Sequence, residues 1–537
     1  MGISTQSWQR LQNALIGTAL VIMTLHVVIY ISFGVALIPF PFDYDQAEGF
    51  ELNNAILLAE GGCPYCDNDV YPFYASGYAP FFHVLMVPFV WLFGADFWYG
   101  RLIIFVATLL TSGAIGYAIW RDEKRLWIGV IAGFAFLASN FIYHIGPLLR
   151  QHLLMVLFET LAVVVIANAF DYRGSKLHRR LFLAFLFLLL AGYTKQLAYS
   201  TCLAVGAWLL LRNPRLALQY SIGLCVIAGA IFGWAMVVTD GQWWINIISS
   251  NQNEYITEQF IGLMRLFVSL HYPLLILALL YSAFELYFSR LSVYTIWFVV
   301  SLASTIGAGK WGAGDSYFAT TLASACILAG LFVARSLNGS WQIKEKHPFA
   351  GIARVKIPSN LLAVASLVLF IVYGSLVIKL PTSGIYEPIA TALNISPTPG
   401  HRYPLYDSAK WTVGYAVTGH FPSEEDYVNG QRIADRVAMT EGLVISEDAG
   451  FAIQVNREVI TNAVQLKNLW ENDLYDPTNL IELLENHEIE LVIRRADLFP
   501  IPVLVAIDTY YQLDEEIAMN GFIYQLWIPK TDEASSE

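Results

Sequence analysis

The sequence predicts a polytopic α-helical membrane protein that carries a small α/β domain at its C-terminal end. Of the 537 residues, 56% are hydrophobic and only 14% are charged, whereas a soluble domain carries about 25% charged residues. The apolar residues gather in long runs before Leu380, and the composition after Leu380 is that of a soluble protein. The net charge of −12 argues against nucleic acid as a partner, because phosphate binding needs a basic surface.

Eleven apolar runs approach the roughly 20 residues that cross a bilayer. In chain order they are Ala14–Phe40, Trp98–Trp120, Trp127–His144, Leu148–Phe170, Leu181–Thr194, Leu197–Leu211, Leu218–Val238, Leu266–Phe284, Val293–Gly307, Tyr317–Val333 and Leu361–Leu380. The first run has no small-residue cleavage pattern after it, which predicts a retained span rather than a signal peptide. One more run, Tyr78–Phe93, is shorter and contains two prolines.

The distribution of Lys and Arg predicts the topology, because these residues mark cytoplasmic loops. The clusters that define the inner side are Arg121 to Arg125, Arg173 to Arg180, Arg212 with Arg215, Arg290, and Arg335 to Lys356. They fall on one side only if Tyr78–Phe93 does not cross, so we expect an interfacial or re-entrant helix there. The prediction is a plasma- or inner-membrane protein of about eleven crossings, with the N-terminus cytoplasmic and the C-terminal domain extracytoplasmic.

The first outer loop, residues 41–97, is acidic. It begins with the motif Asp43-Tyr44-Asp45-Gln46-Ala47-Glu48-Gly49, and no Lys or Arg occurs between Arg10 and Arg101. Seven carboxylates lie between Pro41 and Asp69: Asp43, Asp45, Glu48, Glu51, Glu60, Asp67 and Asp69. Carboxylates at a membrane face, with no basic partner nearby in sequence, are poised to act as bases or to hold a metal. The plainer alternative is that they keep the loop solvated.

Four cations on the predicted outer side go against the charge bias. They are Arg150, Lys195, Arg265 and Lys310, and each lies in a short turn or near a span end. Cations that converge at a membrane face could bind the phosphate head group of a lipid carrier. The alternative is snorkelling or a structural ion pair between helices.

Two cysteines, Cys63 and Cys66, lie in the outer acidic loop as Cys-Pro-Tyr-Cys. An oxidising compartment favours a disulfide between them. A redox site would need a thioredoxin-like βαβ pattern, which is absent from the surrounding sequence. A metal site would need two more ligands, which Asp67, Asp69 or His83 could supply.

Residues 381–537 are expected to form the α/β domain, and nine of the 31 Lys and Arg lie there. Leu443–Ser446, Leu491–Ile493 and Phe522–Ile528 have the apolar patterns of strands. Asp476-Pro477-Thr478-Asn479 can cap a helix that continues to about His487.

Five stretches, taken in order, resemble the GT-C superfamily of integral-membrane glycosyltransferases, in particular its mannosyltransferase-like branch, which uses dolichyl- or polyprenyl-phosphate sugars. They are the motif Asp43–Gly49, the stretch Leu52–Gly94, Arg101-Leu102, the turn Thr194-Lys195-Gln196, and Gly314-Asp315-Ser316-Tyr317-Phe318. The likeness covers most of residues 1–380 and implies a GT-C module with juxtamembrane helices in the first outer loop. His152 departs from the family's usual carboxylate at that place, and Asp315 stands where relatives often have an amide.

The resemblance implies an inverting transfer of a sugar from a polyprenyl-phosphate donor to an acceptor hydroxyl on a protein, glycolipid or polysaccharide. Asp45 is the preferred base, followed by Glu48, which shares its face if the segment is helical, and then Asp43. Lys195 and Arg150 are the expected phosphate partners, with Arg265 and Lys310 behind them. His152, Gln196, Asp315 and Tyr317 are the expected substrate-binding residues. No cofactor is demanded, although the oxygen ligands could hold a divalent ion such as Mg²⁺ or Mn²⁺.

Two other classes of protein remain open. A transporter or flippase of lipid-linked sugars would place charges near the bilayer midplane and often has inverted repeats. Here the charges lie at loop ends and the sequence has no internal repeat. A non-catalytic assembly subunit would carry an inert acidic loop.

Overall fold

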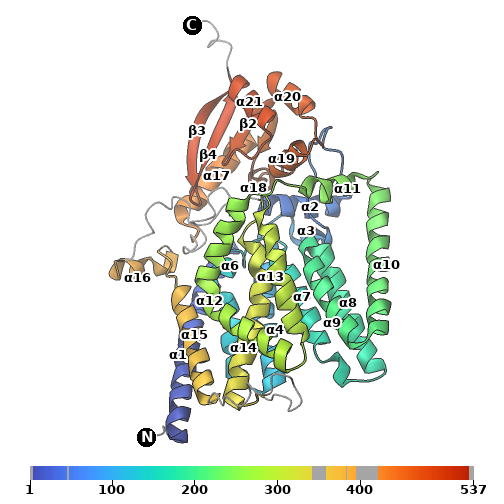
Figure 1. The fold of residues 1–537 in the computed structure, drawn as a ribbon. Coiled ribbons are helices and arrows are strands. Elements are labelled where there is room, and N and C mark those ends of the chain that lie inside the picture. Colours follow the sequence, from blue (N-terminus) through green and yellow to red (C-terminus); the bar gives the residue numbers. More distant parts are fainter. Residues whose placement is uncertain (1–3, 45–46, 342–358, 383, 395–420, 531–537) are drawn as a thin grey trace.

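A computed structural model describes residues 4–44, 47–341, 359–382, 384–394 and 421–530. A bundle of helices forms most of the molecule, and a mixed sheet with its own helices caps one end of the bundle (Figure 1). The chain starts at the opposite end of the bundle from this cap (Figure 1). The predicted class, a polytopic helical protein with a small C-terminal sheet domain, is confirmed.

A helix corresponds to each of the eleven predicted spans. They are α1 (Thr5–Leu37), α4 (Trp98–Glu123), α5 (Leu126–Ala138), α7 (His152–Ile166), α8 (Ser175–Thr194), α9 (Tyr199–Arg212), α10 (Pro214–Val238), α12 (Thr257–Phe288), α13 (Val293–Ser304), α14 (Ala319–Asn338) and α15 (Ser359–Leu376). Within the described residues, eight helices are long and apolar enough to cross a membrane, and α5, α9 and α13 are shorter. The run Trp127–His144 is interrupted at Ser139, whose hydroxyl caps the short α6 (Asn140–Tyr143).

Two short helices form the first outer loop at the capped end of the bundle. They are α2 (Glu48–Glu60) and α3 (Phe81–Phe93), each of 13 residues. At 1.5 Å per residue such a helix spans about 20 Å, which is less than the hydrocarbon core. The two helices pack on each other beneath the sheet (Figure 1). Helix α5 is equally short, so the absence of a crossing at Tyr78–Phe93 stays a prediction from the charge distribution.

The cap contains a four-stranded sheet in the order β1-β2-β4-β3, in which β1 and β2 are parallel and the other pairs antiparallel. Its strands are β1 (Leu443–Ser446), β2 (Ile489–Arg494), β3 (Tyr511–Met519) and β4 (Phe522–Pro529). Its helices are α17 (Glu424–Met439), α18 (Gly450–Gln454), α19 (Ala463–Glu471), α20 (Thr478–Glu485) and α21 (Ile501–Tyr510). The three predicted strands and the predicted helix, α20, are present, whereas β3 was not predicted.

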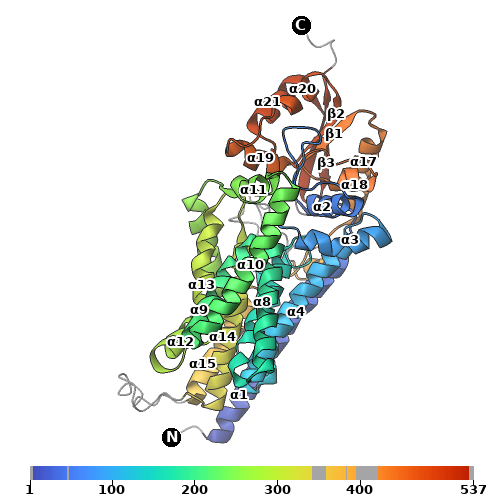
Figure 2. The ribbon, with the colours of Figure 1, turned by 90° about the vertical axis from the view of Figure 1, so that its right-hand side faces the viewer.

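The cap is packed firmly against the bundle. One hydrophobic cluster runs from the helices into the sheet, and aromatic pairs join the two parts. Phe40 packs edge-on against Tyr427 with ring centroids 5.1 Å apart, and Phe42 lies 5.8 Å from Phe451. Figure 2 shows the cap directly above α2 and α3. The first outer loop is therefore enclosed between the bundle and the cap, and its polar residues meet both.

Candidate active site

A cavity of about 510 Å³ lies where the helix ends, the outer loops and the cap meet. Its wall is built from α2, the loops on either side of α2, and the turns that begin α7 and α9. The segment between α11 (Gln242–Ile247) and α12, the loop between α13 and α14, and helix α19 of the cap complete it. Segments distant in sequence thus line one cavity, and their side chains can contact the same ligand.

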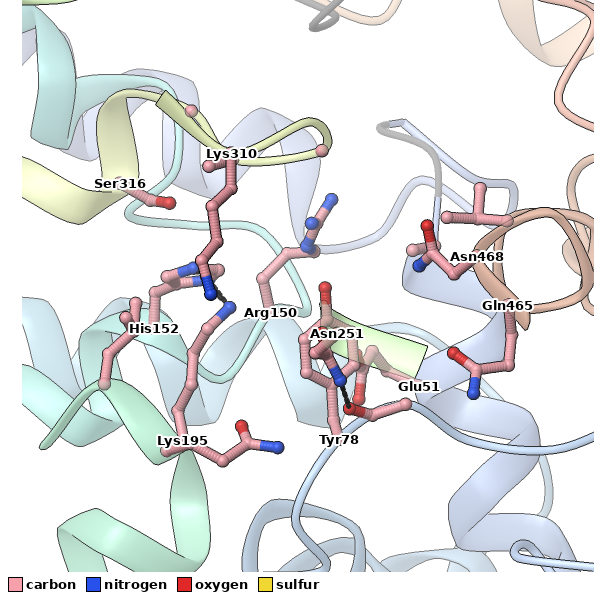
Figure 3. A pocket seen from close by; sticks show the side chains of 18 of the residues that line it. Glu51, Tyr78, Arg150, His152, Lys195, Asn251, Lys310, Ser316, Gln465 and Asn468 are labelled. Atoms are coloured by element: carbon pink, nitrogen blue, oxygen red, sulfur yellow. Dashed lines mark hydrogen bonds between the residues drawn. The ribbon is translucent and has the colours of Figure 1, made fainter. Parts of the chain in front are cut away.

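Three of the four predicted outer cations line this cavity: Arg150, Lys195 and Lys310. Lys195 directly follows α8, and its Nζ lies 2.5 Å from His152 Nε2 and 4.6 Å from the centre of the Tyr78 ring. Figure 3 shows Lys310 reaching down from its loop toward this Lys195–His152 pair. The three basic side chains therefore gather at one end of the cavity, which we call the cation end.

The surroundings of Lys195 disfavour its charged form. Burial, and then the nearby Arg150 guanidinium, hold the pKa of Lys195 well below its ordinary value, while Glu51 opposes the shift. A buried ammonium next to a second cation is unfavourable until a negative group arrives. A phosphate bound here would restore the charge of Lys195 and make charge-assisted hydrogen bonds with both cations.

Glu48, the second candidate base, is fully buried in a structural ion pair. Arg101 donates to both of its carboxylate oxygens at 2.9 Å, and the backbone N–H groups of Tyr44 and Leu149 donate to it at 2.9 and 2.7 Å. Burial raises the pKa of Glu48, but the Arg101 guanidinium and the hydrogen bonds together outweigh burial, and the net pKa lies below the ordinary value. Glu48 does not belong to the cavity lining. Its contacts connect the acidic motif with α4 and with the turn before α7.

Asp43, the third candidate, joins the outer loop to the cap. Its carboxylate accepts hydrogen bonds from Gly49 N at 2.5 Å and from Gly450 N, in α18, at 2.7 Å. Burial and the neighbouring Asp448 carboxylate hold its pKa well above the ordinary value. A Cβ at Gly49 would lie 2.8 Å from this carboxylate, which explains the glycine there. Asp43 is likewise outside the cavity lining.

Asp45, the preferred candidate base, lies outside the described residues. The nearest described residues on either side, Tyr44 and Ala47, both line the cavity. Ala47 has a left-handed backbone (φ 76°), after which α2 begins. The described ends of the acidic motif on both sides of this gap thus belong to the cavity wall.

Glu51 is a cavity residue that the sequence did not single out from the other loop carboxylates. It lies in the first turn of α2, is 1% exposed, and its carboxylate pairs with the buried His83 of α3. No local pattern separates Glu51 from Glu60, which is not in the lining, because only the packing of α2 decides which side faces the cavity. Figure 3 shows Glu51 near Asn251 and Tyr78.

The other predicted residues divide in the same way. Gln196, Asp315 and Tyr317 line the cavity, and Asp315 Oδ2 lies 3.2 Å from His144 Nε2. Arg265 is exposed on α12 and is not in the lining.

Cys63 and Cys66 form a disulfide in the first outer loop. Within the described ranges no three His, Cys, Asp or Glu side chains are grouped to hold a metal ion.

The cap's contribution to the cavity was not anticipated. Asn462, Val464, Gln465 and Asn468, from the start of α19, form one side of it, and Leu498 adds an apolar contact. Asn462 Nδ2 donates to Ala75 O at 3.0 Å, which fixes α19 to the outer loop. No sequence signal links α19 to the membrane part, because the contact depends on how the two parts dock.

The chain matches no protein-family profile and no curated protein sequence. It is similar in structure to ArnT from Cupriavidus metallidurans. Bound to undecaprenyl phosphate, ArnT gives a TM-score of 0.57 at 14% identity, covering 95% of this chain and 98% of that one. Apo ArnT gives 0.53 at the same identity and coverage. The apo oligosaccharyltransferase of Archaeoglobus fulgidus is less similar, with a TM-score of 0.47 at 12% identity over 92% of this chain and 73% of that one. The chain is thus a multi-pass membrane protein with the fold of ArnT.

Proposed function

We propose that this protein is a membrane glycosyltransferase that moves a sugar from a polyprenyl-phosphate carrier to an acceptor hydroxyl. The observation that supports it most directly is the cation end, where Arg150, Lys195 and Lys310 converge in one cavity of a GT-C fold. ArnT, which shares this fold, has been crystallised with undecaprenyl phosphate.

In this proposal the cation end holds the phosphate of the donor. The acceptor oxygen attacks the anomeric carbon while the bond from that carbon to the phosphate oxygen breaks on the opposite face. The configuration inverts, and the lipid phosphate leaves with the bonding electron pair. Arg150, Lys195 and Lys310 stabilise the negative charge that develops on the leaving group, and preorganised stabilisation of this kind supplies much of the rate enhancement in many enzymes. A carboxylate takes the hydroxyl proton.

Asp45 is our candidate for that carboxylate. Glu48 and Asp43 are each engaged by several donors and lie outside the cavity lining, whereas both described neighbours of Asp45 line it. Glu51 lines the cavity and is the competing candidate, although its carboxylate is already paired with His83. A divalent ion held by Asp45 together with other oxygen ligands stays compatible with this proposal.

The topology supports transfer on the extracytoplasmic side. Helix α4 begins beside the cavity, where Arg101 meets Glu48, and ends at the basic cluster Arg121 to Arg125. By the positive-inside rule that far end is cytoplasmic. The cavity and the cap then face the outside, and the N-terminus faces the cytoplasm.

The test is transfer of labelled sugar from a polyprenyl-phosphate hexose by the purified full-length protein, with a membrane extract as acceptor. We expect Asp45→Asn to lower the rate about 10²- to 10⁴-fold and to leave the unfolding temperature unchanged. Glu51→Gln is the matched variant, since Glu51 is the competing candidate and its carboxylate lines the cavity. Loss of transfer in Glu51→Gln and not in Asp45→Asn would move the base to Glu51. No transfer by the unaltered protein with any donor would favour a transporter or an assembly subunit.

A further inference from the structure

The cavity has two chemically different sides. Lys195, His152 and Lys310 lie on one side in Figure 3, and Gln465 and Asn468 lie on the other. The second side carries several carboxamides, and the carboxylate of Glu51 lies beside Asn251. We call it the amide wall and define it as Asn251, Asn253, Asn462, Gln465 and Asn468, all of which line the cavity. The lining residues of α19 itself are Val464, Gln465 and Asn468, and none is charged.

Several amides of this wall are held in fixed orientations by the backbone around them. Gln465 Nε2 donates to Asn246 O at 3.2 Å and to Asn246 Oδ1 at 3.0 Å. Asn253 Nδ2 donates to Trp311 O at 2.9 Å, and Asn251 Nδ2 donates to Ile247 O at 3.0 Å. These hydrogen bonds engage the N–H groups of the amides and fix the planes of the side chains.

Two oxygens of the amide wall have no protein partner. Asn253 Oδ1 and Asn468 Oδ1 are shielded from solvent and accept no hydrogen bond from any described residue. An unsatisfied buried acceptor costs roughly 1 to 3 kcal/mol, so such atoms mark a place where a ligand or water completes the bonding. The donors they lack need carry no charge, and hydroxyl groups fit this requirement.

We propose that the amide wall is the subsite for a hydroxyl-rich saccharide ring that carries no carboxylate, with Asn253 and Asn468 accepting hydrogen bonds from its hydroxyls. This inference rests on the proposed function, and it adds the class of sugar and a role for the cap. Carboxamides can both donate to and accept from hydroxyls. A uronic acid would instead bring a carboxylate against these carbonyl oxygens and toward Glu51, which is costly in a shielded cavity. The ring belongs either to the donor or to the acceptor.

The experiment compares the affinity of the purified full-length protein for two ligands, polyprenyl phosphate and polyprenyl-phosphate hexose. Asn468→Leu removes the amide of α19 with a side chain of similar size. Asn253→Ala removes the amide of the segment between α11 and α12. Asn486→Leu, at the exposed end of α20 and outside the lining, is the matched control. If the ring is the donor's, both cavity variants bind the hexose ligand roughly 5- to 10-fold more weakly and bind polyprenyl phosphate as before. If it is the acceptor's, both donor affinities stay unchanged and the KM for the acceptor rises by a similar factor.

Other results would overturn the inference. Unchanged donor affinity together with an unchanged acceptor KM in both cavity variants would remove the subsite. Tighter binding of a uronic-acid donor than of the hexose donor by the unaltered protein would contradict a ring without a carboxylate. If the unaltered protein binds neither polyprenyl phosphate nor the hexose ligand, the proposed function itself fails and the subsite fails with it. Binding of polyprenyl phosphate with no effect of either variant leaves the proposed function standing and refutes only the saccharide subsite.

Discussion

Replacement of Arg101 by methionine tests whether this side chain fixes the acidic motif to α1 and α4. Arg101 is fully buried at the start of α4 and donates twice to Glu48. It also donates to Phe42 O at 2.7 Å, to Leu37 O at 3.0 Å and to Phe40 O. One side chain therefore joins the end of α1, the acidic motif and α4.

The expected loss of folding stability follows from the buried groups that lose a hydrogen-bond partner in the variant. Methionine fills much of the space but leaves the buried Glu48 carboxylate without its guanidinium partner, while the backbone donors of Tyr44 and Leu149 stay in place. Removing one partner of a buried ion pair costs about 3 to 5 kcal/mol. Three carbonyls lose their donors as well, at roughly 1 to 3 kcal/mol for each one that water does not reach. We therefore expect a loss of at least about 3 kcal/mol, against a total stability of about 5 to 15 kcal/mol for a folded protein.

The assay is unfolding in mixed detergent–SDS micelles followed by tryptophan fluorescence, for Arg101→Met, Glu48→Gln and the double variant. Because the two side chains form an ion pair with each other, the double variant is expected to lose less than the sum of the singles. A loss below about 0.5 kcal/mol for Arg101→Met, or strict additivity, would refute the structural pairing. Glu48 would then be available as a catalytic base.

Further predictions concern Lys195 and the docking of the cap. Lys195→Met should weaken binding of polyprenyl phosphate yet stabilise the ligand-free protein, since burial and Arg150 disfavour the ammonium. The pKa of Lys195 is lower in the folded protein than in the unfolded chain, so the unfolded chain binds more protons. The unaltered protein therefore gains stability as the pH rises toward 10.5, the ordinary pKa of lysine. Thermal unfolding scans across pH should show a weaker dependence of stability on pH for the variant. Gly450→Ala should loosen the cap, because its Cβ would meet the Asp43 carboxylate, and limited proteolysis should cut the cap faster. Gly113→Ala, with open space around its Cβ, should not.

Much of the fold follows from local sequence. Each apolar run became a helix because burying backbone in lipid requires internal hydrogen bonding. Leu443–Ser446 became β1 as predicted, since a short apolar run between turns fits a buried strand. Strand β3 was missed because Asp514, Glu515 and Glu516 interrupt its apolar alternation. It pairs only with β4, at the edge of the sheet, where charged residues are tolerated.

The site was less predictable because its contacts are long-range. The acidic motif has no cation near it in sequence, yet its Glu48 meets Arg101, the residue that ends the cation-free stretch. The distribution of Lys and Arg between the two sides of the membrane is a property of the whole chain. It singled out Arg150, Lys195 and Lys310, because they lie on the side that has few cations. Arg265 gave the same signal, but its position on α12 leaves it outside the cavity lining.

The two-part wall of the cavity also constrains how the protein is made. Glu51 and Lys195 emerge early in synthesis, but Asn468 follows only after more than half of the chain has been added, and the cap strand β4 ends at Pro529. Until that strand pairs with β2, the cap has no complete sheet on which to hold α19. A newly inserted bundle therefore carries an open cation end. It acquires its second wall only after β4 has been made, so a chain that stops within the cap would lack the α19 side of the cavity.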